Sequence, residues 1–394
     1  MNILIFELKK IFKPLNIILV LLTTLIAYNR FIIPEIHMLK NSQPSKQINN
    51  IGAMLANNYG STISINEFEE IKKTRDNKVK VATEYLIKQP ESKKANIKDY
   101  NDFYNAREQG LGERRKYVDI KLMKKIEERV LFEENIYLFW ELPQIENYIT
   151  TYEHKKDFIA KEIDYYKSIV SSSAIDKLRD IGESENFTSP MNGIVHNNYD
   201  QLIFWETVIV LISLAITISP IFIADNRNKI NYIQYSSKIG RNIVKKKVIA
   251  GIITSFIIVT FQVVIFFIVY KQLGTFPYLD AYINSFLSSN YFWFDLTFRQ
   301  YIYITIIILY IISLLACFIS MYISSRVNSY LSLIGIQVPI LYGIIMLQLK
   351  FGTTSVTTIL FPKHTTLGIY TSIIIIIMII SLYMEKKENS IDII

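Results

Sequence analysis

Two apolar runs flank a basic segment at residues 201–270, which read QLIFWETVIVLISLAITISPIFIA (201–224), DNRNKINYIQYSSKIGRNIVKKK (225–247) and VIAGIITSFIIVTFQVVIFFIVY (248–270). Each outer run is long enough to cross a bilayer as a helix, for which about 20 apolar residues are needed. The segment between them carries seven Lys and Arg residues against Asp225 alone. Because basic loops between spans are retained on the cytoplasmic side, this stretch predicts two membrane helices joined inside the cell.

The rest of the 394-residue chain continues this pattern, and 51% of its residues are apolar. Six segments are predicted to span the membrane: 15–33, 201–224, 248–270, 300–323, 329–349 and 365–384. A backbone surrounded by lipid must satisfy its own hydrogen bonds, which favours helices. We therefore predict an all-α polytopic membrane protein with six transmembrane helices.

Basic residues set the predicted orientation. With the N-terminus inside, the cytoplasmic segments hold thirteen Lys and Arg residues and the short outer loops hold four. Both termini, including the tail 385–394, are therefore predicted to be cytoplasmic and residues 34–200 extracellular. Six lysines are predicted to anchor the inner interface at the lipid headgroups: Lys9, Lys10, Lys13, Lys245, Lys246 and Lys247.

Residues 1–14 have the pattern of a short amphipathic helix. Leu4, Leu8, Ile11 and Leu15 share one helical face. We predict an elbow helix lying in the inner membrane interface, with Pro14 opening the first span. The alternative is a frayed tail whose lysines only set the topology.

Residues 34–200 are polar and rich in helix-forming residues. Between residues 30 and 200 there are 26 Lys and Arg against 27 Asp and Glu, a net charge of −1. The basic excess thus lies in the membrane part, and nucleic acid is excluded as a partner because it would require a basic soluble face. We predict a helical domain of three to five helices, with a capping box at Ser64-x-x-Glu67 and a heptad stripe from Ile145 to Val170.

The outer loop 274–298 is crowded with aromatic residues. Phe292, Trp293 and Phe294 are its densest run. Because aromatic side chains concentrate at membrane interfaces, we consider these three residues a candidate outer gate. An ordinary aromatic belt is the alternative.

No catalytic or metal-binding motif stands out. The sequence lacks the H-E-x-x-H, G-x-S-x-G, C-x-x-C and Walker A patterns. Its four histidines are dispersed, and its only cysteine, Cys317, falls in the fourth span. Glu206 is the one acid placed inside a predicted span, near its outer end, where it can reach the headgroups. We predict no catalytic residue, no metal and no cofactor in this chain.

Three segments carry a resemblance to a known family. They are Phe6-Glu-Leu-Lys-Lys10, Ile223-Ala-Asp225-x-Arg227 followed by Tyr235-Ser-Ser-Lys-Ile-Gly-Arg241 and Lys247, and Ile319-Ser-Met-Tyr-Ile-Ser-Ser-Arg326. In their order and topology they resemble ABC-2 type permeases, the six-span membrane subunits of many bacterial ATP-driven exporters. Asp225 replaces the more usual Glu, and the insertion between spans one and two is unusually long.

The resemblance implies a bacterial cell membrane protein that works with a cytoplasmic ABC ATPase dimer and a second permease subunit, identical or paralogous. ATP and Mg²⁺ would bind the ATPase. The coupling segment that docks into the ATPase would be Tyr235, Ser236, Ser237, Lys238, Ile239, Gly240 and Arg241. The cargo is expected to be amphipathic or hydrophobic, such as an antimicrobial or signalling peptide.

Two alternatives remain open at this point. The basic cluster at 225–247 can be explained by topology alone. The chain can also be a sensory or interaction protein whose outer domain detects a peptide and signals to a cytoplasmic partner without transport.

Overall fold

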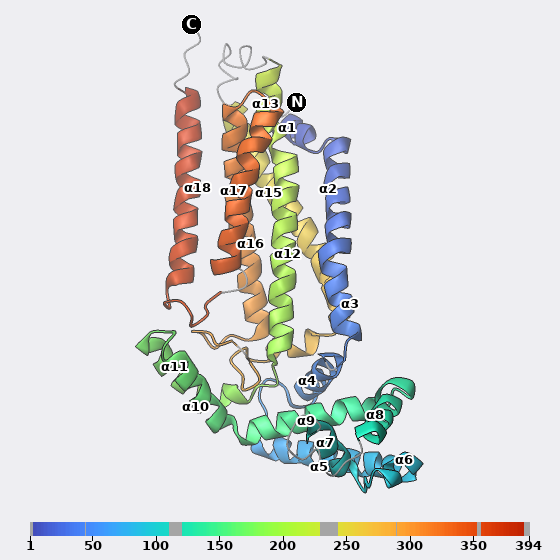
Figure 1. Ribbon diagram of the computed structural model, residues 1–394. Coiled ribbons are helices and arrows are strands. Elements are labelled where there is room, and N and C mark those ends of the chain that lie inside the picture. The colour runs from blue at the N-terminus through green and yellow to red at the C-terminus, as the bar shows by residue number, and fades with distance from the viewer. Residues whose placement is uncertain are drawn as a thin grey trace.

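The computed structural model describes residues 3–43, 45–109, 120–228, 243–288, 290–352 and 356–389. Within these ranges the regular elements are helices, and β-structure is limited to three isolated bridges. Six helical spans are long and apolar enough to cross a membrane. The predicted all-α, six-span membrane protein is therefore confirmed. Figure 1 shows the spans side by side, with a helical domain at one end of the bundle.

The spans follow the predicted order. They are α2 (Pro14–Ala27) continued by the π-helical turn η1 (Tyr28–Ile32) and α3 (Ile33–Asn41), α12 (Gly193–Ile218) continued by α13 (Pro220–Arg227), α15 (Ile243–Tyr270), α16 (Phe298–Arg326), α17 (Tyr330–Phe351) and α18 (Thr365–Asn389). The first span runs past residue 33 to Asn41, and the second begins at Gly193 instead of residue 201. Both extensions contain polar residues, so hydropathy alone assigned them to the domain.

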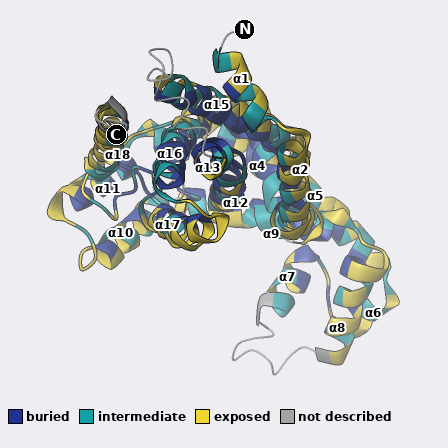
Figure 2. Ribbon diagram, turned by 90° about the horizontal axis from the view of Figure 1, so that it is seen from above, coloured by how far each residue is buried: buried dark blue, intermediate teal, exposed yellow. Residues whose placement is uncertain are grey.

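Burial distinguishes the centre of the bundle from its periphery. In the most apolar 18-residue stretch of each span, the share of buried residues is 67% for the second span but 11% for the sixth. Viewed along the bundle, α12 and α16 lie at the centre, whereas α2, α17 and α18 present exposed faces outward (Figure 2). Those faces carry large apolar side chains such as Leu25, Leu347 and Leu382. Contiguous apolar surface of this kind is suited to lipid.

The domain contains eight α-helices within its described residues, more than the three to five predicted. They are α4 (Ser45–Tyr59), α5 (Ile65–Lys88), α6 (Pro90–Lys94), α7 (Tyr100–Gln109), α8 (Ile120–Glu128), α9 (Tyr137–Glu153), α10 (Lys155–Tyr166) and α11 (Ser172–Glu183). The capping box at Ser64 and Glu67 is confirmed. The predicted heptad stripe keeps one buried face but is divided between α9 and α10, because the chain leaves the helical conformation at His154.

The domain is built on two hydrophobic cores. One core contains residues of α4, α5, α9, α10 and α11 and is centred on Phe68, Ile145 and Leu178. The other joins α5 to α9 around Tyr100, Phe103 and Phe139. Figure 2 shows α6, α7 and α8 projecting beyond the outline of the bundle. The first core also includes residues from the loops that join the spans at the domain end of the bundle, such as Phe286 and Ile359, and is thereby connected to the bundle.

The aromatic loop 274–297 makes this connection. Its Phe286 and Tyr291 belong to the first domain core, while Phe292 packs into the core of the bundle. The Tyr278 hydroxyl donates to the carbonyl oxygen of Asn49 on α4 at 2.8 Å. A side chain at Gly52 would collide with that same hydroxyl. Glycine at this position thus allows α4 to approach the loop closely.

Candidate functional site

The N-terminal helix α1 (Ile3–Ile11) packs against the bundle at the end opposite the domain (Figure 1). Leu4, Leu8 and Ile11 join a hydrophobic core with α13 and α15. Leu15, the fourth residue of the predicted apolar face, is exposed because Pro14 begins a new helix. The apolar face of α1 is therefore covered by protein. We call this end of the bundle the terminal end, because the last turns of α18 also lie there (Figure 1).

Four charged side chains at the terminal end form one ion-pair network. The Lys10 ammonium donates to both carboxylate oxygens of Asp225 at 3.0 Å and to Glu7 at 2.9 Å. The Lys247 ammonium lies 2.7 Å from the Asp225 carboxylate. Asp225 thus joins α1, α13 and α15 through a single carboxylate.

Burial makes this network unlike a surface ion pair. The side chains of Asp225 and Lys247 are 3% and 4% exposed. Lys247 also lies 4.6 Å from the centre of the Phe222 ring. Burial lowers the pKa of Lys10, but the hydrogen bonds to Glu7 and Asp225 outweigh this effect and leave the pKa raised. Losing one partner from such a buried pair typically costs 3–5 kcal/mol of stability, since a charge is left without compensation.

The break between α12 and α13 lies beside this network. Pro220 has no N–H and interrupts the helical hydrogen bonding. The Ser324 hydroxyl of α16 accepts from the N–H groups of Phe222 (3.2 Å) and Ile223 (3.0 Å) and donates to the Ser219 carbonyl oxygen. The break is thereby held in one geometry by a neighbouring span.

A second polar contact fixes the same break to α17. The side-chain amide of Gln337 donates to Ser320 of α16 at 2.8 Å, and its oxygen accepts from the Ser219 hydroxyl at 2.7 Å. All three side chains are buried. Spans two, four and five are therefore joined by hydrogen bonds close to Asp225.

These contacts bring together the three segments that carry the family resemblance. Lys10 pairs with Asp225, and Ser324 bonds to the residues just before Asp225. The predicted coupling residues Tyr235 to Arg241 lie outside the described residues. Both flanks of that segment, α13 and the start of α15, belong to the network.

The six predicted anchor lysines fall into different environments. Lys9, Lys13 and Lys245 are exposed, and Lys246 is partly exposed. Lys10 and Lys247 instead pair with Asp225, and the buried Lys247 cannot present its charge to headgroups. The sequence feature that could have predicted this pairing is Asp225, the single acid in the basic stretch 225–247.

The candidate gate residues are packed into the junction with the domain. Phe292 and Trp293 are 1% and 8% exposed, whereas Phe294 is 41% exposed. The Trp293 indole N–H donates to the Phe361 carbonyl oxygen at 2.8 Å. Phe292 packs against His196 and Tyr301. Two of the three side chains thus hold the loop in place instead of lining an opening.

The half of α12 nearer the domain carries more ionisable groups than predicted. Glu206 is completely buried and accepts a 2.7 Å hydrogen bond from Tyr28, so it does not reach the headgroups. Asp200 accepts from Tyr301 at 2.7 Å, and His196 lies 3.5 Å from Asp200. These two residues were missed because the second span begins earlier than hydropathy indicates. Their spacing of four residues on one helix was the available signal.

No cluster of metal-ligating side chains occurs within the part of the chain that the structure describes. The described residues of the terminal end connect α1, α13, α15, α16 and α17 through ion pairs and hydrogen bonds. Comparison with known proteins found no matching family model, no matching curated protein and no matching solved structure.

Proposed function

We propose that this chain is the transmembrane permease subunit of an ATP-driven exporter of the ABC-2 type, energised by a separate cytoplasmic ATPase dimer that binds ATP and Mg²⁺. The observation that carries the proposal is the sharing of Asp225 by Lys10 and Lys247. It supports a mechanical role because it joins both flanks of residues 229–242 to α1. A force applied to that segment would reach α13 and α15 together.

The rigid connection also explains how such a force would spread. Hydrogen bonds from Ser324 and Gln337 link the α12–α13 break to α16 and α17. A short element fixed between two spans can convert partner movement into rigid-body tilting. In this proposal the terminal end is cytoplasmic, the domain is extracellular, and a second permease subunit completes the path for a peptide or other amphipathic cargo in a bacterial cell membrane.

Co-purification in mild detergent tests the class of protein. We expect the tagged chain to bring down a protein with Walker motifs. Arg241→Glu should abolish this association or the coupled transport without preventing membrane insertion, because it reverses charge in the proposed contact. Lys229→Glu, in the same segment but outside the proposed contact, is the matched control. Normal co-purification together with normal transport in Arg241→Glu would contradict the docking assignment.

A sensory protein without transport is the second candidate function. The cavities between the domain and the bundle support a sensor as much as an exporter. A sensor needs a ligand-binding site but no transport path. Vesicles containing the purified complex and ATP distinguish the two candidates: an exporter moves cargo, and a sensor does not.

A further inference from the structure

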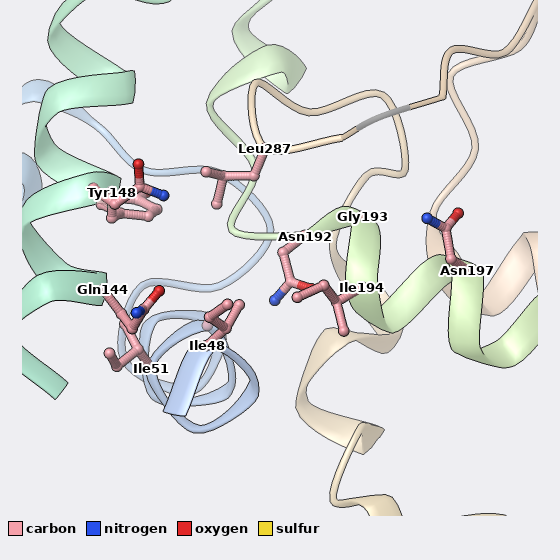
Figure 3. Close-up of a pocket in the computed structure, with 11 residues that line it drawn as sticks. Ile48, Ile51, Gln144, Tyr148, Asn192, Gly193, Ile194, Asn197 and Leu287 are labelled. Atoms are coloured by element: carbon pink, nitrogen blue, oxygen red, sulfur yellow. The ribbon is translucent and has the colours of Figure 1, made fainter. Parts of the chain in front are cut away.

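A cavity of about 260 Å³ lies where the domain meets the second span. Figure 3 shows its walls converging from α4, α9, the first turn of α12 and the loop at Leu287. Its volume is close to the lower limit of about 300 Å³ for typical small-ligand sites. Asn147 and Asn197 on its rim are exposed, so a ligand can enter from solvent.

Among the described residues that line this cavity, none is charged. This is unusual in a part of the chain where residues 30–200 hold 26 Lys and Arg and 27 Asp and Glu. Burying a charge without a partner is strongly unfavourable. The cavity therefore suits a ligand that is uncharged where it is enclosed.

Three polar side chains on α9 have no hydrogen-bond partner among the described residues. Gln144, Asn147 and Tyr148 are three and four positions apart and hence share one helical face. The amides of Gln144 and Asn147 make no side-chain hydrogen bond to described residues, and the Tyr148 hydroxyl is buried and unpaired. Tyr148 as a whole is only 3% exposed. The Tyr148 hydroxyl has almost no accessible surface, so the polar groups that a ligand can reach on this wall are the amides of Gln144 and Asn147.

The opposite wall supplies a backbone donor and apolar surface. In the first turn of α12, Gly193 donates to the Leu287 carbonyl oxygen and Val195 to the Asn192 side chain, each at 3.0 Å. The Ile194 N–H has no such partner within the described ranges. Ile48 and Ile51 of α4 face the same space (Figure 3).

We propose that this cavity binds an uncharged, extended segment of a peptide. Each peptide group offers one donor and one acceptor, which match the amides on α9 and the Ile194 N–H. Successive side chains of an extended chain point to opposite sides, toward the apolar walls. An anionic lipid headgroup would instead select the neighbouring cavity lined by Lys40 and Lys46.

The identification of this peptide as exporter cargo rests on the proposed function, whereas the binding itself does not. The test therefore measures binding alone, in the full-length chain reconstituted in lipid nanodiscs. The probe is a tripeptide of leucine, photoleucine and leucine with an acetylated N-terminus and an amidated C-terminus, so that it carries no charge.

We expect saturable photo-crosslinking, mapped by mass spectrometry to α4, α9 or the first turn of α12. Excess acetyl-Leu-Ala-Leu-amide should compete. Absence of a saturable adduct, or adducts confined to the lipid-facing spans, would overturn the proposal.

Substitutions of residues that line the cavity then test their contribution to peptide binding. Gln144→Ala combined with Asn147→Ala should weaken binding more than about tenfold, since each lost hydrogen bond is worth about 1 kcal/mol. Ile194→Trp should block binding by filling the cavity. Asn77→Ala, an exposed amide on α5 away from the cavity, is the matched control and should bind normally.

The Lys46→Gln variant shows in which of the two neighbouring cavities the peptide binds. Unchanged binding supports the uncharged site, whereas a loss in Lys46→Gln with normal binding in the α9 double variant assigns the ligand to the lysine-lined cavity and overturns the proposal. Low reactivity of the buried Cys317 thiol verifies folding in each variant. Peptide binding without ATPase co-purification would contradict the proposed exporter function and support the proposed peptide site. ATPase co-purification without peptide binding would contradict only the peptide site.

Discussion

Asp225 connects three helices at the terminal end. Its carboxylate is the common acceptor for Lys10 and Lys247, and all three lie in different helices. The sequence marks Asp225 as the single acid of a basic stretch, which predicts a special role. It does not reveal the partners, because Lys10 is 215 positions away and Lys247 is one of three consecutive lysines.

We predict that Asp225→Asn lowers stability by about 3 kcal/mol, because two ammonium groups lose their carboxylate and Lys247 stays buried. The measurement is thermal unfolding in detergent, followed with a thiol-reactive dye. Cys317 is the only cysteine and is buried, so it reports unfolding without engineering.

The exposed Lys245 provides the control for this measurement. Lys245→Met should change stability by less than about 0.5 kcal/mol, as is usual for surface positions. Equal unfolding temperatures for Asp225→Asn and the unmodified chain would show that the buried network does not stabilise the terminal end.

Glu91 in α6 gives a prediction about pH. Hydrogen bonds from Arg129, at 2.8 and 3.0 Å, lower the pKa of Glu91 from 4.5 to about 2. A carboxyl group with a lowered pKa stabilises the fold above its unfolded-state value and loses that effect as the pH falls through its folded-state value. We expect the stability contributed by Glu91 to be complete above about pH 4.5 and to disappear toward pH 2.

Glu91→Gln should therefore lower the unfolding temperature at pH 6 but have progressively less effect as the pH approaches 2. Circular dichroism of the full-length chain at a series of pH values measures this difference. Glu84→Gln, at an exposed position of α5, is the control and should show no such pH dependence. A constant difference at all pH values would contradict the role of the Arg129 pair.

At the scale of elements, the aromatic loop shows where sequence patterns stop being informative. Composition identified the run 292–294, but it could not separate a gate from a packed junction, because both need aromatic side chains. In this structure Phe292 and Trp293 lie in hydrophobic cores and Phe294 does not, and a stability measurement distinguishes the two interpretations. The same limit affects α12, whose first polar turns were assigned to the domain although they are part of the second span.

We predict that Trp293→Ala destabilises the protein by about 3–5 kcal/mol, since it removes a large buried side chain and its hydrogen bond to Phe361. Phe294→Ala should cost less than about 1 kcal/mol because its side chain is already partly in solvent. Thermal unfolding of the two variants provides the comparison. Similar small losses for both would instead favour a mobile gate.

At the scale of the whole molecule, the number and order of the spans could be predicted because hydropathy is a summed property of long segments. The helices of the domain could not, because their ends depend on single residues such as His154 and on tertiary contacts. The terminal end and the domain lie at opposite ends of the bundle (Figure 1). The helix α1 and the last turns of α18, near the two ends of the chain, lie at the same end of the bundle, as an even number of spans requires.

Labelling of introduced cysteines determines the sidedness. Asn77 in the domain and Lys13 before the first span are both exposed. In intact cells, a membrane-impermeant maleimide should label Asn77→Cys, whereas Lys13→Cys should react only after permeabilisation. Cys317 is buried and serves as the unreactive background. Labelling of Lys13→Cys in intact cells would reverse the predicted orientation.

The length of α12 has a mechanical consequence. Its 26 residues extend from the cavity at Gly193 to the break at Pro220, beside the Asp225 network. At a rise of 1.5 Å per residue this is a lever arm of about 39 Å, and a tilt of about 5° at one end shifts the other by about 3 Å. A displacement of that size equals the length of a hydrogen bond. If α12 tilts as a rigid body, a small angular change at the terminal end is enough to open or close contacts around the cavity, and the ligand binding proposed there would act on the same helix in the opposite direction.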